Sequence, residues 1–434
     1  MNEPIIIYNI FPRLAGKLDQ WLRHAERARE LGFTWIFLNP VQLPGFSGSL
    51  YSVKDHRSVN PEFLPEGTRG NGYAELGRTL SLLHDLGLRV MVDLVINHTA
   101  IDSPLVEEHP SWFRWTEEHG QAKVRNPCAV DPDDPRICTV WGDLAEVDNE
   151  ASLDKEGLWS FWEQVVVEYL ELGFDGFRCD AAYKVPAKLW QRLIDRARQL
   201  RPEALFCAET LGCTPREVFA LRGCGFDLLF NSSKWWSFDK PWALEQHEAY
   251  QEVAPSIAFP ESHDTERLAA QTGGLEAVQQ QRYAFAAAFS KGVMILIGYE
   301  LGFRRKLHVV HTGPDSWEQP GMDISRFIQH VNQLKASQPL LQVEGRLQAV
   351  SPMDRPTLVL EKRDEATGES MLVVVNKDWH QPQELCLPRP FGAHDGGRPT
   401  LVLHRLLAGQ TEPWPEHDWL WLQPAEVVYA LPAA

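Results

Sequence analysis

Short apolar runs alternate with longer amphipathic runs along most of this chain, and no other sequence feature constrains its fold as strongly. Residues 5–11 and 34–38 are rich in β-branched and aromatic side chains, and the segment between them at 18–31 has the spacing of an amphipathic helix. A strand, a helix and a second strand in this order form a βαβ unit with parallel strands. The alternation therefore predicts an α/β fold.

The number of apolar runs indicates how the strands assemble. Further runs follow at 89–95, 174–178, 204–208, 226–230, 256–259 and 293–297, which makes eight candidate strands, and helix-like segments lie among them at 73–86 and 186–200. Several runs are apolar throughout, as in parallel strands that are covered on both faces. We therefore expect a (β/α)8 TIM barrel with an outer ring of helices.

One segment interrupts the alternation after the third strand. Residues 99–152 are rich in Pro, Asp, Glu and Trp and lack a clear βα repeat. A disordered loop is one interpretation, but Trp112, Phe113, Trp115 and Trp141 supply apolar surface that needs to be covered. We therefore expect a small inserted subdomain between strand 3 and helix 3, and a catalytic barrel formed by residues 1–98 and 153–335.

The pattern changes again after a helix-like segment at 324–334. Short candidate strands at 358–361, 372–376, 384–387, 401–404 and 427–430 are separated by turns that contain Pro, Gly and Asp. Closely spaced strands of this kind favour an antiparallel sheet. Residues 336–434 are therefore predicted to form a C-terminal, β-sandwich-like domain.

Charge and cysteine content exclude several classes of partner. The formal net charge is -17 and no run is rich in Lys or Arg, which argues against nucleic acid and anionic membrane surfaces. No run approaches the roughly 18 apolar residues of a membrane-spanning helix, and the first residues lack the features of a signal peptide. The seven cysteines include no CxxC pair, so free thiols in the cytoplasm are expected. The sequence leaves the oligomeric state open.

Polar side chains follow several of the predicted strands at the point where each strand ends. In a barrel of this kind the reactive groups lie at the carboxyl ends of the strands. Taken singly, each of these acids is more readily explained as a solvated loop residue or a helix N-cap. The residues in question are Asp93, Asn97 and His98 after strand 3, Arg178 and Asp180 after strand 4, Glu209 after strand 5, and Glu261, His263 and Asp264 after strand 7.

The combination of these residues is more informative than any one of them. Arg178 lies two residues before Asp180 and so faces the same side of its strand, where it can keep a carboxylate ionised and oriented. Glu209 arrives from the next strand. Two carboxyl groups flanking a glycosidic bond are the minimum for retaining glycoside chemistry, and a third acid at Asp264 would help to raise the pKa of Glu209.

Four short motifs around these residues resemble the signature regions of the alpha-amylase superfamily. They are DLVINH at 93–98, GFRCD at 176–180, AET at 208–210 and SHD at 262–264, and their order and spacing fit that superfamily. The similarity extends to GFTWIFLNPV at 32–41 and YSVKDHRSVNPEF at 51–63, so it spans nearly the whole chain from residue 5. HPSWFRW, IGYELG and VVVNKD are also similar to segments of bacterial maltosyltransferases that use maltose 1-phosphate.

The resemblance implies a role for each matching residue. Asp180 would be the nucleophile, Glu209 the general acid/base and Asp264 a stabiliser of the transition state, whereas Asp93 would be a structural acid. The resemblance also implies five substrate-binding residues. Arg178 would orient Asp180, and Tyr183 would lie beside this nucleophile. His98 and His263 would hydrogen-bond the same sugar ring, and Tyr51 would stack on that ring.

The resemblance also bears on metal binding. Asn97 matches a calcium ligand of many amylases, but Tyr183 and Lys184 stand where many of those enzymes carry a Lys-His pair that helps to hold calcium. One Asn and an uncertain acid from the insert do not supply the roughly six to eight oxygen ligands that calcium takes. We therefore expect no metal and no other cofactor.

These features predict a retaining α-glycosidase or transglycosylase that acts on α-1,4-linked glucans or maltooligosaccharides through a covalent glycosyl-enzyme intermediate. One alternative is a dedicated maltosyl- or glucosyltransferase or phosphorylase that uses a sugar phosphate, with Lys54, Arg57 and Lys184 as a possible anion site. A non-catalytic carbohydrate-binding accessory protein is another alternative, which the intact acidic trio disfavours. Candidate acceptor-side platforms are Trp112, Trp115, Trp141, Trp235 and Trp236, although core packing explains such Trp residues equally well.

Overall fold

The computed structural model of the chain contains a closed barrel of eight parallel strands. It describes residues 3–130, 138–387, 401–415 and 417–433. All eight predicted strands are barrel strands, so the predicted TIM barrel is confirmed. In chain order they are β1 (Ile6–Ile10), β2 (Trp35–Leu38), β5 (Arg89–Leu94), β12 (Gly176–Cys179), β13 (Leu205–Glu209), β14 (Leu228–Phe230), β15 (Ser256–Ala258) and β16 (Gly292–Leu296).

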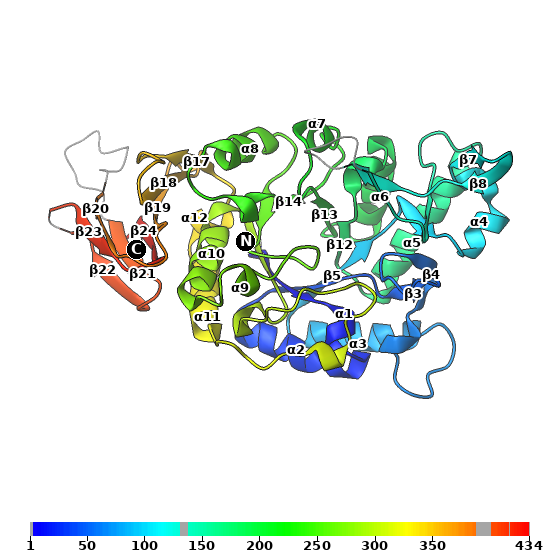
Figure 1. Ribbon diagram of the computed structural model, residues 1–434, viewed down its shortest axis with the longest axis horizontal. Helices are drawn as coiled ribbons and strands as arrows, with labels where there is room; N and C mark the ends of the chain where they lie inside the picture. Colours follow the sequence, from blue (N-terminus) through cyan, green and yellow to red (C-terminus); the bar gives the residue numbers. More distant parts are fainter. Residues whose placement is uncertain (1–2, 131–137, 388–400, 416, 434) are drawn as a thin grey trace.

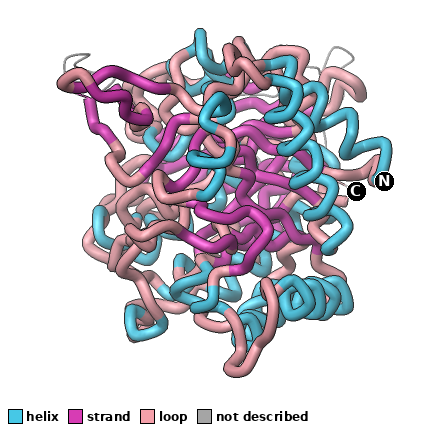
Figure 2. Tube along the Cα trace, turned by 90° about the vertical axis from the view of Figure 1, so that its right-hand side faces the viewer, coloured by secondary structure: helices cyan, strands magenta, loops and turns pink. Residues whose placement is uncertain are grey.

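Alternate side chains of each strand face opposite sides of the barrel wall. In β1, for example, Ile7 belongs to an apolar cluster inside the barrel, whereas Ile6 and Tyr8 belong to the larger cluster beneath the helices. Both sides are apolar, which explains the continuous hydrophobic runs in the sequence. Figure 2 shows the strands at the centre of the molecule with helices around them.

The outer layer consists of helices that pack their apolar faces on the barrel. The four predicted helices all form, and the one expected at 186–200 begins directly after Pro186, which is its N-cap. None of the described helices is long and apolar enough to cross a membrane. The α-helices outside the insert are α1 (Pro12–Ala15), α2 (Leu18–Glu30), α3 (Tyr73–Asp85), α5 (Lys155–Leu172), α6 (Ala187–Leu200), α7 (Pro215–Phe219), α8 (Trp242–Tyr250), α9 (Leu268–Gln271), α10 (Glu276–Phe289), α11 (Ser325–Ser337) and α12 (Pro339–Gln342).

The segment between β5 and α5 folds into short antiparallel pairs. These are β6 (His98–Ala100) with β11 (Leu144–Glu146), β7 (Trp115–Glu118) with β8 (Gln121–Val124), and β9 (Cys128–Val130) with β10 (Cys138–Val140), together with α4 (Pro104–Glu108). Trp112 and Phe113 are buried, whereas Trp115 and Trp141 remain largely exposed. Residues 131–137 of the predicted insert lie outside the described residues. A further pair, β3 (Gln42–Pro44) with β4 (Val53–Val59), follows β2 and was not predicted.

The last hundred residues form an antiparallel sheet, as predicted. Its strand order is β17 (Arg346–Ala349), β18 (Thr357–Arg363), β19 (Ser370–Asn376), β24 (Val427–Pro432), β21 (Leu401–Arg405) and β22 (Gln410–Pro413), and β20 (Gln383–Cys386) pairs with β23 (Trp419–Leu422) beside it. Residues 388–400 and 416 of the predicted domain lie outside the described residues.

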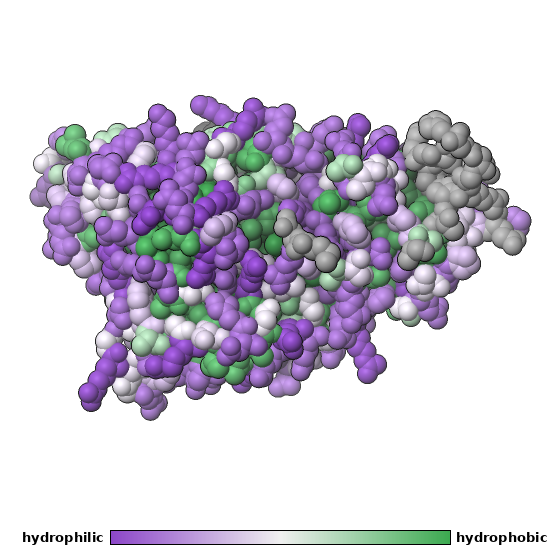
Figure 3. Space-filling view, turned by 180° about the vertical axis from the view of Figure 1, so that it is seen from behind, coloured by the Kyte–Doolittle hydropathy of each residue, from purple (hydrophilic) through white to green (hydrophobic). Residues whose placement is uncertain are grey.

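The molecule is elongated, with the C-terminal strands at one end, β7 and β8 at the other, and the barrel between them (Figure 1). Short 3-10 helices complete the described structure: η1 (Pro61–Phe63), η2 (Pro110–Trp112), η3 (Ala182–Lys184), η4 (Ser233–Trp235), η5 (Tyr299–Leu301) and η6 (Pro314–Ser316). The face seen from behind is mostly hydrophilic, with hydrophobic residues in scattered patches (Figure 3), which is ordinary for a protein surface.

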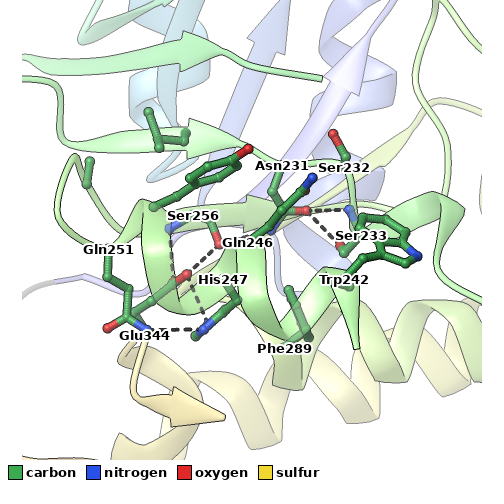
Figure 4. A pocket seen from close by; sticks show the side chains of 14 residues that line it. Asn231, Ser232, Ser233, Trp242, Gln246, His247, Gln251, Ser256, Phe289 and Glu344 are labelled. Atoms are coloured by element: carbon green, nitrogen blue, oxygen red, sulfur yellow. Dashed lines mark hydrogen bonds and ion pairs between the residues drawn. The ribbon is translucent and has the colours of Figure 1, made fainter. Parts of the chain in front are cut away.

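One buried carboxylate joins the segment before β17 to the barrel. Glu344 accepts hydrogen bonds from the backbone N–H groups of Ser256 and Lys291, both at 2.9 Å, and from the Ser256 hydroxyl at 2.5 Å. His247 Nε2 lies 3.2 Å from the same carboxylate, beside a cavity of about 20 Å³ (Figure 4). Because Ser256 is the first residue of β15, this contact lies at the amino end of the barrel, where interactions stabilise the fold.

Replacing Glu344 should therefore destabilise the protein. We expect Glu344→Ala to lower the free energy of unfolding by about 2–4 kcal/mol, because it leaves two backbone N–H groups without their buried acceptor. Urea denaturation monitored by Trp fluorescence measures this change. Glu384→Ala on the exposed side of β20 is the control and should change stability by less than about 0.5 kcal/mol. Equal stability of the two variants would contradict the role of Glu344.

Candidate active site

The side chain of Arg178 is the centre of a cluster of acids at the carboxyl end of the barrel. Its Nη1 atom lies 2.7 Å from Asp93 Oδ1 and 2.8 Å from Asp180 Oδ1, and its Nη2 atom lies 2.9 Å from Glu209 Oε1 and 4.0 Å from Asp264 Oδ2. The Arg178 side chain is only 5% exposed. Acids from four separate places in the sequence therefore converge on one buried guanidinium.

The period of the strands explains this convergence. Side chains two residues apart share a face, so Asp93 and Arg178 point into the barrel above the apolar layer that contains Met91 and Cys207. Asp93 and Arg178 are also direct partners in the β5–β12 register. At the bottom of this face Gly176 has no room for a side chain, since a Cβ atom would lie 2.6 Å from the Leu205 carbonyl oxygen.

Asp180 follows the last residue of β12 and is almost fully buried. Burial raises the pKa of Asp180 to about 6, and the adjacent Arg178 guanidinium limits this rise. The carboxylate is therefore mostly ionised at neutral pH and is held by a charge-assisted hydrogen bond. This is the condition that a nucleophilic carboxylate requires.

Glu209 is the last residue of β13, and its two oxygens have different partners. Oε1 contacts Arg178, and Oε2 accepts a hydrogen bond of 2.8 Å from the backbone N–H of Ala181. Burial raises the pKa of Glu209, and the charges of Asp180 and Asp264 raise it further against the opposing effect of Arg178. A carboxyl group with a raised pKa beside an ionised one suits a general acid.

His263 and Asp264 project from the loop after β15. His263 Nε2 lies 3.0 Å from Asp264 Oδ2. Desolvation in the cleft acts to raise the pKa of Asp264, but the charge and hydrogen bond of His263 dominate and lower it to about 2. Because 47% of the Asp264 side chain is still exposed, desolvation of its carboxylate is incomplete, and His263 is the main cause of its low pKa. Asp264 is therefore an ionised hydrogen-bond acceptor that faces the open side of the cluster.

Tyr51 connects the Asp264 loop to the Arg178 cluster. Its hydroxyl donates to Asp93 Oδ2 at 2.7 Å and lies 2.6 Å from His263 Nε2, and its ring stacks on the His263 imidazole with centroids 5.4 Å apart. Burial raises the pKa of Tyr51 well above its ordinary value, so the hydroxyl keeps its proton. Since that proton is given to Asp93, His263 Nε2–H is the donor on this side, and its one hydrogen is shared between the tyrosine oxygen and Asp264 Oδ2.

Two of the predicted substrate-binding residues lie outside this cluster. His98 is buried and its Nε2 atom bonds the backbone oxygen of Tyr51 at 3.0 Å, so it contacts the site only through that backbone. Burial lowers the pKa of His98 to about 4, which keeps the ring neutral. Tyr183 lines a cavity of about 600 Å³ between the barrel and the insert, next to Lys184.

The side chains around this cavity do not fit a calcium site. Asn97 Oδ1 is buried there without a hydrogen-bond partner among the described residues, but Asn149 Oδ1 already accepts a hydrogen bond from Trp162. Lys184 Nζ lies 3.0 Å from the Cys128 carbonyl oxygen, where its charge would repel a metal ion. The cavity is also lined by Glu146, which is paired with Arg125, and by Glu150, but no three acidic, His or Cys side chains gather at one point among the described residues, so the oxygen cage that calcium takes is not formed there.

The cations that were predicted to form an anion site are mostly neutralised. Lys54 Nζ is paired with Asp102 at 2.8 Å, and Arg57 Nε is paired with Glu168 at 2.8 Å. Lys184 instead bonds the Cys128 carbonyl and lies over the ring of Trp141, with its Nζ atom 5.2 Å from the ring centroid. Of the three cations, only Lys184 has no carboxylate partner among the described residues.

Two of the five predicted acceptor-side Trp residues are core residues. Trp236 is fully buried and its Nε1 donates to the Lys240 carbonyl, and Trp112 is 4% exposed and bonds Asp154. Trp235 in η4, by contrast, is 52% exposed. Its ring lies about 3.6 Å from the point where Gly212, three residues after Glu209, would carry a Cβ atom. Trp235 therefore lies beside the loop that follows the candidate acid.

Two residues that shape the site were not predicted from the sequence. Asn39 Nδ2 donates to the Tyr51 hydroxyl at 3.0 Å, and its place directly after β2 was the available signal. Ala181 adopts a left-handed conformation, with φ of 40° and ψ of 48°, that aims its N–H at Glu209. Non-glycine residues seldom adopt this conformation, and no sequence pattern announces it.

The chain is similar in sequence to several known proteins. A family model described as the glucanotransferase domain of the glycogen debranching enzyme matches residues 1–114. An alpha-1,4-glucan:maltose-1-phosphate maltosyltransferase from Burkholderia pseudomallei is 26% identical over 405 residues, which are 90% of this chain and 34% of that protein. The Myxococcus xanthus enzyme of the same name is 25% identical over 452 residues, covering 95% of this chain and 65% of the relative. The chain thus spans about one third to two thirds of the length of these curated relatives.

Solved structures resemble the fold over its whole length. An alpha-amylase from Lactobacillus plantarum superposes with a TM-score of 0.75 at 21% identity, covering 98% of both chains. An alpha-amylase from Geobacillus thermoleovorans complexed with acarbose gives a TM-score of 0.76 at 16% identity, covering 99% of both chains. In its four signature motifs and in the barrel with its C-terminal sheet the chain is similar to enzymes of the alpha-amylase superfamily, and in sequence it is similar to the maltosyltransferases.

Proposed function

We propose that this protein is a retaining enzyme that cleaves α-1,4-linked glucans or maltooligosaccharides and transfers the released glycosyl unit to water or to a second sugar. The observation that carries this proposal is the Arg178 guanidinium, which bonds Asp180 on one nitrogen and Glu209 on the other. The two carboxyl groups are thereby held side by side with different ionisation, as a double-displacement mechanism requires.

In the first step Asp180 attacks the anomeric carbon of the bound glucosyl unit. The bond between that carbon and the glycosidic oxygen breaks, and Glu209 gives its proton to the departing oxygen. The product is a glycosyl ester on Asp180. The charge of Arg178 stabilises the carboxylate before attack, and Asp264, ionised beside His263, is placed to accept hydrogen bonds from sugar hydroxyls.

In the second step Glu209 acts as a base. It takes a proton from a water molecule or from an acceptor hydroxyl, whose oxygen attacks the anomeric carbon and releases Asp180. Two inversions leave the α-configuration unchanged. A sugar held near Glu209 competes with water because its effective concentration is high, and the exposed ring of Trp235 offers a surface for such a sugar.

A sugar phosphate is a second candidate for the donor. The relatives from Burkholderia pseudomallei and Myxococcus xanthus are both named as maltosyltransferases of maltose 1-phosphate. Lys184 supports this candidate because it follows the nucleophile by four residues and has no carboxylate partner among the described residues. We also propose that the protein acts in the cytoplasm, which is supported by six cysteines that are free thiols: Cys128, Cys179, Cys207, Cys213, Cys224 and Cys386.

Asp180→Asn and Glu209→Gln should each lower kcat on maltooligosaccharides by about 10³-fold or more, because each removes one half of the two-carboxylate mechanism. Proton NMR of the wild-type reaction should show the α-anomer as the first product, with or without added phosphate. Asp195→Asn on the exposed face of α6 is the control and should retain full activity. Normal turnover in either active-site variant, or a β-anomer as the first product, would exclude the mechanism.

The activity should also depend on pH in a defined direction. Asp180 must be ionised to attack, and its pKa is raised to about 6 by burial, so kcat/KM should fall about tenfold per pH unit below this value. Loss of the Glu209 proton, whose pKa is raised, should produce the alkaline limb. Initial rates measured from about pH 4 to pH 9, with circular dichroism to confirm folding at each pH, test this profile. A flat profile through pH 6 would contradict it.

Trp235→Ala should shift the products from transfer toward hydrolysis. Loss of a stacking surface weakens acceptor binding by about 1 kcal/mol, so the ratio of transfer to hydrolysis should fall by about fivefold. Chromatography of products longer than the starting maltotriose gives this ratio. The matched control is Trp419→Ala, which removes an equally exposed ring from β23 and should leave the ratio unchanged. An unchanged ratio in Trp235→Ala would remove this residue from the acceptor side.

A further inference from the structure

A fully buried ion pair closes the loop that carries His263 and Asp264. Glu261, three residues before Asp264, and Arg267, three residues after it, are each 1% exposed, and Arg267 Nη1 lies 2.6 Å from Glu261 Oε1. The two ends of a seven-residue loop are thus held together by a charge-assisted hydrogen bond, with Asp264 at its middle. In the part of the chain that the structure describes, neither residue forms a hydrogen bond or an ion pair with Arg178, Asp180 or Glu209.

Both partners of this pair are also fixed to their surroundings. Glu261 Oε2 accepts a hydrogen bond of 2.7 Å from the backbone N–H of Leu268, the first residue of α9. Arg267 Nη2 donates to the Ile297 carbonyl at 3.0 Å, and its Nε donates to the Arg305 carbonyl at 3.3 Å. The loop after β15 is therefore attached to the chain that leaves β16, the next strand of the barrel.

Within the loop, a tight turn leaves little freedom for Asp264. Ser262 N–H donates to the Thr265 hydroxyl at 3.0 Å, and Thr265 N–H donates to the Ser262 carbonyl at 3.2 Å. The Asp264 carboxylate lies 4.0 Å from Arg178 and is hydrogen-bonded to His263, but about half of the side chain is still exposed. These two neighbours therefore do not enclose it. Its position is determined mainly by the backbone of the loop.

A buried ion pair adds little to stability when compared with apolar residues of the same size. Stabilisation of the fold therefore does not explain why Glu261 and Arg267 are paired in the core. Arg267 contacts three acceptors on three different segments through three separate nitrogen atoms, Nη1, Nη2 and Nε, whereas an apolar pair has no such donor and a lysine has one nitrogen at a single position.

We propose that Glu261 and Arg267 are positioning residues that fix Asp264 and His263 against the Asp180–Arg178–Glu209 cluster. They act through the loop and touch no substrate. The inference rests on the proposed function, in which Asp264 holds sugar hydroxyls more tightly in the transition state than in the ground state. Loosening the loop then lowers the rate of the chemical step and leaves the initial binding of substrate almost unchanged.

The first test compares Arg267→Lys with wild type on maltotriose. Lysine keeps the buried charge, but its one nitrogen atom replaces three nitrogen atoms of the guanidinium that lie at different positions, so it cannot keep all three contacts in place, and we expect kcat to fall by about 10- to 100-fold while KM changes by less than about threefold. Arg405→Lys is the matched control, because Arg405 forms a comparable pair with buried Glu426 in the C-terminal sheet. It should leave both kcat and KM unchanged. A normal kcat in Arg267→Lys, or a rise in KM alone, would overturn the proposal.

A second variant guards against misfolding. Glu261→Gln combined with Arg267→Met removes both charges and leaves no unpaired buried ion, so it should unfold at nearly the wild-type urea concentration. It should still show the selective loss of kcat. Wild-type stability together with wild-type kcat would overturn the positioning role even if Arg267→Lys does not fold.

Crystal structures of the same variants separate this inference from the proposed function. The distance between Arg178 Nη2 and Asp264 Oδ2 should increase from 4.0 Å, with the Asp180 and Glu209 contacts of Arg178 retained. An Asp264 that does not move in either variant would overturn the inference whatever the enzyme does. A wild-type protein without activity on any α-glucan would overturn the proposed function instead, and the displacement of Asp264 would still decide whether the pair positions it.

Discussion

The carboxyl end of this barrel depends on the positive charge of Arg178. Asp93, Asp180 and Glu209 all lie within hydrogen-bond distance of its guanidinium, in a region where each would lose its charge if it were alone. The planar fork of the arginine places two separate nitrogen atoms against acids on two sides, whereas a lysine would offer a single nitrogen at one position. The shape of this one side chain therefore sets the arrangement of β5, β12 and β13 at the point where the proposed chemistry takes place.

Different ionisation of similar groups follows from their neighbours. Asp180 and Asp264 have the same side chain, yet burial raises the pKa of the first to about 6, while His263 lowers the pKa of the second to about 2. Tyr51 connects the two environments through its hydrogen bonds to Asp93 and His263. The pKa of the proposed nucleophile after β12 and the pKa of the proposed stabiliser after β15 are thus set by different surroundings.

The sequence predicts those features that depend on local pattern. Eight apolar runs became eight barrel strands because a buried parallel strand needs apolar side chains on both faces, and the acids that follow these runs met because parallel strands end at the same edge. Features that depend on partners far along the chain could not be predicted. Trp235 and Trp236 are neighbours of the same type, but one is exposed and the other lies in the core. Lys54 and Arg57 were candidates for the anion site that the sugar-phosphate alternative needs, and each instead meets a carboxylate that no spacing indicates.

The contact of Glu344 with β15 has a consequence for the modularity of the molecule. Other buried links accompany it: Lys362 and Tyr429 in the C-terminal sheet bond carbonyl groups at Ala288 and Ala284 in α10. Backbone carbonyl groups of the barrel helix α10 thus accept hydrogen bonds from side chains of the sheet, and they would lose these partners without it. The C-terminal sheet is not an appendage that recombination can exchange freely among barrels of this type, and chimaeras need a donor sheet that brings the same carboxylate, ammonium and hydroxyl groups.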